Sequence, residues 1–139
     1  DSMSLKERAT KEFKEKIDSD EEIRESILTY YECESGFSGL VGVPNGNSVP
    51  IRGVLAYTEK SLLFYGEVFS KLPIILHIPF NKITEIKTGK QIFTIFKSTL
   101  TMVVVHNDQE IFSTRGNKED FSRLKSFFEN VNEEVFLAK

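Results

Sequence analysis

Few side chains in this sequence of 139 residues could perform chemistry. It contains one cysteine, Cys33, and two histidines, His77 and His106, each in a different segment. The CxxC and HxxxH spacings that bring metal ligands together do not occur. A single cysteine also excludes an internal disulfide, and Cys33 within a predicted strand is typical of a small buried hydrophobic residue. We therefore predict neither a metal site nor a cofactor.

The glycine-rich stretch GFSGLVGVPNGN, residues 36–47, could be a phosphate-binding loop. A Walker-type loop ends in Gly-Lys-Ser/Thr, so that the lysine and the hydroxyl reach the phosphates, and a helix follows. Here Asn47 and Ser48 follow Gly46, and a predicted strand comes next. GFSG also matches the G-x-S-x-G elbow of hydrolases only in part. Spacing does not test a catalytic triad built from distant residues, but no motif indicates an enzyme, and we predict that the chain is not one.

The same stretch carries the apolar residues Phe37, Leu40 and Val41. Its glycines, proline and asparagines favour a long hairpin loop. These apolar side chains could meet a membrane, a partner protein or the fold itself, and the sequence leaves the three alternatives open.

Basic residues are concentrated in the middle of the chain. The net charge is −3, yet residues 68–107 hold five lysines against one glutamate. An anionic partner would be attracted to such a segment, although lysines also protect sheet edges and turns. The acidic chain has no RNA-binding aromatic–basic motif, which argues against nucleic acid. The predicted lipid- or partner-binding residues are Phe37, Leu40, Val41, Arg52, Lys82, Lys87, Lys90 and Lys97.

Two amphipathic helices and a set of short strands would position these residues. Leu5, Ala9, Phe13 and Ile17 recur every four residues and predict an N-terminal helix, whose stripe could pack on its own fold or receive another chain. Short apolar and β-branched segments predict about seven antiparallel strands, at 27–35, 51–58, 62–69, 74–80 with a continuation over 81–88, 91–96, 100–106 and 110–115.

Residues 117–131 predict a closing helix. Asn117 is its candidate N-cap. Its apolar face consists of Phe121, Leu124, Phe127, Phe128 and Val131. A nearly closed sheet protects its edges, and this helix would seal its open end. We predict a mostly β (α+β) fold, an antiparallel seven-stranded barrel or sandwich capped by the C-terminal helix.

Residues 52–89 resemble the GRAM and bacterial pleckstrin-homology-like pattern. The matching elements, in order, are Gly53, Thr58, Leu63 to Tyr65, Ile78 to Phe80, and Ile83 with Ile86. The resemblance extends over roughly residues 27–135 and implies a PH-like fold. It also implies that the loop after the first strand borders a headgroup site in lipid-binding members. Glu32 and Glu34 stand on the first strand here instead of the basic pattern of those members, which leaves phosphoinositide recognition in doubt.

We therefore expect an N-terminal helical extension over residues 1–26 and a PH/GRAM-like domain over residues 27–139. The expected function is a non-catalytic, cytoplasmic module that binds a protein or acts as an adaptor close to a membrane. Alternatives are weak peripheral binding to anionic lipid and a homo-oligomeric scaffold. No apolar run reaches the roughly 20 residues that span a bilayer.

Overall fold

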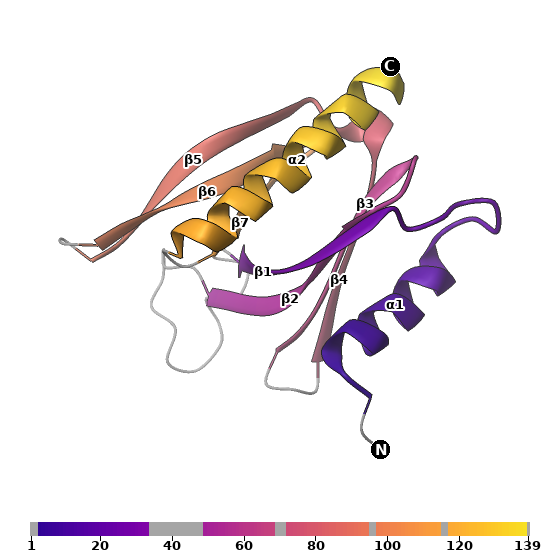
Figure 1. Cartoon of the computed structure of the whole chain (residues 1–139), viewed down its shortest axis with the longest axis horizontal. Coiled ribbons are helices and arrows are strands. Elements are labelled where there is room, and N and C mark those ends of the chain that lie inside the picture. The colour runs from indigo at the N-terminus through magenta and orange to yellow at the C-terminus, as the bar shows by residue number, and fades with distance from the viewer. Residues whose placement is uncertain (1–2, 34–48, 69–71, 95–96, 115–116, 139) are drawn as a thin grey trace.

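The computed structural model describes residues 3–33, 49–68, 72–94, 97–114 and 117–138 (Figure 1). Side chains are not described at positions 33, 49, 90–94 and 97–99. The helices are α1 (Leu5–Lys16), the short 3-10 turn η2 (Phe80–Lys82) and α2 (Lys118–Ala138). The strands are β1 (Glu25–Cys33), β2 (Val49–Tyr57), β3 (Ser61–Val68), β4 (Leu72–Pro79), β5 (Glu85–Thr94), β6 (Lys97–Val105) and β7 (Gln109–Ser113).

The strands form one curled antiparallel sheet in the order β4-β3-β2-β1-β7-β6-β5. The result is a half-barrel, with α2 across its inner face and α1 against its outer face (Figure 1). The predicted fold class, mostly β with a helix at each end, is confirmed. Two details differ. β1 begins at Glu25, two residues ahead of the predicted strand start at 27, and the segments predicted at 81–88 and 91–96 contribute to the single strand β5.

The inner core is built around phenylalanine rings. Phe127 and Phe128 of α2 are fully buried and lie with their ring centroids 5.4 Å apart, and Phe128 reaches Phe112 of β7 at 5.8 Å. The predicted apolar face of the closing helix is therefore in the core, and the helix continues to Ala138, which adds Val135 to that face. The Asn117 side chain caps this helix, because its Oδ1 accepts from the Asp120 amide at 3.0 Å.

A second, smaller core lies on the outer face of the sheet. Ala9 and Phe13 of α1 are buried against β2 and β3, in contact with residues that include Val54 and Tyr65. The helix begins with a capping box in which Ser4 and Glu7 each bond the other's backbone amide. The N-terminal apolar stripe, for which packing on its own fold and binding of another chain were the alternatives, therefore packs on its own sheet. Within the described ranges, neither α1 nor α2 is long and apolar enough to cross a bilayer.

Candidate binding groove beside β1

A serine, a glutamate and a histidine do gather at one end of the sheet, but their bonding is structural. Glu21 is 7% exposed and accepts from the hydroxyl of Ser61 at 2.7 Å and from the hydroxyl of Thr58. Burial favours the protonated acid, yet these hydroxyls and the Asp18 amide outweigh it and lower the pKa of Glu21. The Ser61 hydroxyl thus points to a carboxylate rather than to His77, which is exposed. This cluster ties the α1–β1 connection to the β2–β3 turn.

The other histidine belongs to a second polar link. His106 Nε2 lies 2.7 Å from one carboxylate oxygen of Glu110, and the Tyr31 hydroxyl donates to the other oxygen at 2.5 Å. The Tyr31 ring packs against both Phe64 and Phe112, at centroid distances of 5.4 and 5.5 Å. The link therefore joins β1 to the end of the β6–β7 hairpin. Among the described residues, no three histidine, cysteine or acidic side chains are grouped as a metal site would require.

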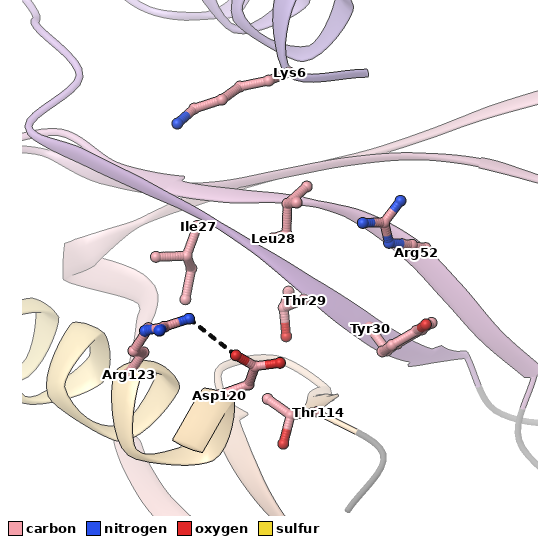
Figure 2. A pocket seen from close by; sticks show the side chains of 9 residues that line it. All are labelled: Lys6, Ile27, Leu28, Thr29, Tyr30, Arg52, Thr114, Asp120 and Arg123. Carbon is pink, nitrogen blue, oxygen red and sulfur yellow. Dashed lines mark hydrogen bonds and ion pairs between the residues drawn. The ribbon is translucent and has the colours of Figure 1, made fainter. Parts of the chain in front are cut away.

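A groove with a volume of about 430 Å³ lies along β1, between α1 and the first turns of α2 (Figure 2). Its lining is made of basic, aliphatic and hydroxyl side chains with one acid. The lining residues are Lys6, Ile27, Leu28, Thr29, Tyr30, Arg52, Thr114, Asp120 and Arg123. Figure 2 shows Lys6 and Arg123 approaching from opposite sides of β1, with Arg52 beside Tyr30. Such a volume lies within the range of small ligand-binding clefts.

Each cation of the groove is held by a different part of the fold. Lys6 stands on α1, which is fixed to the sheet by the buried Phe13. Arg52 stands on β2, in register with Tyr30 of β1. Arg123 stands on the α2 turn that follows the Asn117 cap. The cap residue is itself bonded to the residue that follows β7, since Thr114 Oγ1 donates to the Asn117 carbonyl at 3.0 Å. Rigid elements thus set the positions of all three Cα atoms.

The groove carries an excess of positive charge. Lys6, Arg52 and Arg123 are exposed, and Asp120 is the single carboxylate in the lining. Arg123 donates to Asp120 at 3.0 Å, which leaves Lys6 and Arg52 as the cations without an acid in the lining. Leu28 is 50% exposed between them. The surface is complementary in charge and polarity to an anionic ligand that carries an apolar group.

Part of the β1 backbone faces away from β2 along the groove. Among the described residues, β7 pairs with β1 only at Tyr30 and Tyr31, so the part of β1 that precedes Tyr30 has a strand neighbour on one side alone. The Thr58 amide donates to the Ser61 carbonyl at 2.9 Å. Since backbone groups alternate along a strand, the N–H and C=O groups of the even-numbered residues of β2 point toward β3, and those of the odd-numbered residues point toward β1. Leu28 lies opposite Val54. Its N–H and C=O therefore face away from β2, toward the groove.

The predicted binding residues whose side chains the structure describes stand on three different elements. Arg52 lines the groove, whereas the exposed Lys82 is in η2 and the exposed Lys87 is in β5. In the sheet order, β1, β7 and β6 separate β5 from β2. Lys90 and Lys97 lie on the β5 and β6 backbones, and their side chains are outside the description. Phe37, Leu40 and Val41 fall in 34–48, outside the described residues.

The sequence did not point to Lys6, Arg123 or Leu28. Lys6 and Arg123 lie in terminal segments whose net charge is negative, and each looks like one polar residue on an amphipathic helix. Leu28 looks like an ordinary strand residue. The available signal was the polar face of each helix, but only the packing of the helices shows which of those residues meet at β1.

Family models and curated protein sequences gave no match to this chain.

Proposed function

We propose that this chain is a non-catalytic binding module and that its groove beside β1 holds an extended, acidic segment of a partner protein. The observation that carries the proposal is the placement of Lys6, Arg52 and Arg123 along β1, with the exposed Leu28 between Lys6 and Arg52. Carboxylates on the segment would pair with the cations, and an aliphatic side chain would cover Leu28. The outward backbone groups of Leu28 support the extended conformation, because they offer a bond to a neighbouring strand.

Electrostatic attraction alone would be weak here. An exposed ion pair contributes about 0.2–1 kcal/mol, so the three cations together fall short of the roughly 4 kcal/mol that corresponds to millimolar affinity. Backbone pairing and burial of Leu28 must supply the remainder. Binding should therefore weaken with salt but also depend on the apolar residues of the segment.

A protein segment fits these contacts better than a membrane surface does. A flat anionic surface gains from cations that face one way, at about 1 kcal/mol for each lysine or arginine near it. Lys87 stands on β5, which β6, β7 and β1 separate from β2 in the sheet order, and Lys82 stands in the turn η2 between β4 and β5. The groove cations, by contrast, converge from three elements on one strand (Figure 2).

The test is titration of fluorescein-labelled peptides with alternating glutamate and valine, followed by anisotropy at low salt, with a lysine–valine peptide as the charge control. The glutamate peptide should bind, and Arg52→Glu combined with Arg123→Glu should weaken it by about tenfold or more, the equivalent of 1.4 kcal/mol. Lys87→Glu, which changes an exposed cation on β5, is the matched control and should bind as the wild type.

Equal binding of the glutamate and lysine peptides would contradict the proposal that the groove binds this segment. So would a loss of affinity in Lys87→Glu as large as that in the Arg52→Glu, Arg123→Glu double variant. Co-sedimentation with anionic vesicles that survives Arg52→Glu and Arg123→Glu while the peptide fails to bind would favour the lipid alternative instead.

A further inference from the structure

The strand β4 is an edge of the sheet without the usual protection. Its only strand partner among the described residues is β3, and its sequence, LPIILHIP, contains no lysine, arginine or acid. Edge strands of natural proteins commonly carry charges that prevent further pairing. The opposite edge, β5, has Glu85 and Lys87. On β4, in contrast, Leu72 is 63% exposed.

Two hydrogen bonds define which backbone groups of β4 point outward. The Phe80 amide donates to the Lys60 carbonyl at 2.8 Å, so Phe80, just after β4, faces β3. The Thr58 amide donates to the Ser61 carbonyl, so the backbone groups of Ser61 point toward β2 and those of Leu62, the next residue of β3, point toward β4. Backbone groups alternate along an antiparallel strand. Both bonds therefore show that the backbone N–H and C=O groups of the even-numbered residues of β4 point toward β3. The same groups of the odd-numbered residues point away from the sheet.

The outward positions are occupied by Pro73, Ile75, His77 and Pro79. Proline has no N–H, so Ile75 and His77 supply the outward donors of this strand. The two prolines are equally distant from Leu76, and so are Ile75 and His77. The donor pattern of this edge is consequently the same when it is read from either end.

We propose that β4 pairs antiparallel with β4 of a second copy of this chain, about a two-fold axis at Leu76. Ile75 then lies opposite His77 of the second copy, and each donates its N–H to the carbonyl of the other. By symmetry, His77 of the first copy and Ile75 of the second copy form the same two bonds. Pro73 lies opposite Pro79 of the second copy, where neither has a donor, so the ladder ends without an unpaired amide. A pairing shifted along the strand would set a donor against a proline.

The side chains of β4 fit the same arrangement. Ile74 and Leu76 are half-buried on the inner face, at the margin of the main core. In the dimer, Leu76 meets Leu76 of the second copy at a non-hydrogen-bonded position, where cross-strand side chains are closest. His77 is exposed on the outer face and would lie beside Ile75 of the second copy. A dimer therefore covers apolar side chains that the single chain leaves partly in water. This surface is separate from the groove beside β1, and the inference does not depend on the proposed function.

Sedimentation velocity across a dilution series from low to high micromolar concentration tests the proposal. The wild type should show a concentration-dependent dimer. Leu76→Lys and Leu76→Glu should each raise the dissociation constant by about tenfold or more, because like charges then meet at the axis. An equimolar mixture of the two variants should restore a dimer. Lys87→Glu on the other edge strand is the control and should dimerise as the wild type.

His77→Pro removes an outward donor and leaves the ladder with β3 intact, so it should be a folded monomer with a cooperative thermal transition. This variant still tests the interface if the Leu76 variants do not fold. A wild type that stays monomeric throughout the series would overturn the proposal. So would a dimer that persists in His77→Pro and in both Leu76 variants, or a lysine–glutamate mixture that stays monomeric while each variant is folded.

Discussion

The guanidinium of Arg8 on α1 donates to both carboxylate oxygens of Glu67 on β3, through Nε at 2.8 Å and Nη2 at 2.9 Å. The Tyr65 hydroxyl donates to the same carboxylate at 2.5 Å. The bonds from Arg8 and then Tyr65 lower the pKa of Glu67. Burial, followed by the bond to Glu67, raises the pKa of Tyr65 to about 12. The ionised Glu67 is therefore part of what attaches α1 to the outer face of the sheet.

Acid should weaken this attachment. Because the folded pKa of Glu67 lies below its ordinary value, its contribution is present above the unfolded pKa of about 4.3 and is lost as the pH falls through the folded pKa. Glu67→Gln should lower the free energy of unfolding at pH 7, and this free energy should then fall less steeply between pH 5 and 3. Part of the fall should remain, because the pKa of Glu21 is also lowered. Urea unfolding at a series of pH values measures both effects. An acid dependence unchanged in Glu67→Gln would contradict this account.

The pair Gly53 and Gly66, in register on β2 and β3, makes room for a core ring. A Cβ at Gly53 would lie 2.2 Å from the Tyr65 carbonyl oxygen and 2.5 Å from the Phe64 ring. Gly53→Ala should therefore cost about 1–3 kcal/mol or more through overpacking. Gly89→Ala is the control in β5, because its Cβ would meet only side-chain atoms, at 2.9 and 3.0 Å, and should cost less. Denaturant midpoints compare the two, and a Gly53→Ala protein as stable as Gly89→Ala would refute the close approach.

Phe127 anchors α2 in the half-barrel. It is fully buried, and its ring lies edge-on to Tyr57 at 5.3 Å and to Phe128 at 5.4 Å. Phe127→Ala should lower the free energy of unfolding by about 3–5 kcal/mol, and Phe127→Asp should abolish a cooperative transition or cause aggregation. Phe136 on the same helix is 81% exposed, and Phe136→Ala should change stability by no more than about 0.5 kcal/mol. Thermal melting of the three variants checks this. A melting curve unshifted by Phe127→Asp would mean that α2 does not seal the sheet.

Local periodicity predicted most of the elements. The four-residue spacing of the N-terminal stripe, from Leu5 to Ile17, and the apolar face at Phe127 are signals within a few turns of chain, and both lie where they were expected. The segments 81–88 and 91–96 were predicted separately, whereas one strand, β5, runs from Glu85 to Thr94. β6 pairs continuously with this part of β5, from Glu85 to Ile92, and such pairing overrides the weak local preference of a glycine.

The site residues show the limit of that approach. Arg52 was singled out because it follows the glycine-rich stretch, and it does line the groove. Its neighbours Lys6 and Arg123 were not found, because charge counted along the chain assigns both to acidic segments. The lysines of the central segment were grouped for the same reason, yet Lys82 stands in the turn η2 and Lys87 on β5, which β1, β7 and β6 separate from β2.

The sequence by itself determined the number and type of the elements, the faces they bury and the sparseness of catalytic groups, since these follow from side-chain period and composition over short stretches. Tertiary structure alone decided which cations converge on β1 and which backbone groups of β4 point outward. Both depend on strand register and on helix docking, which join residues far apart in the chain, and no local pattern encodes that proximity.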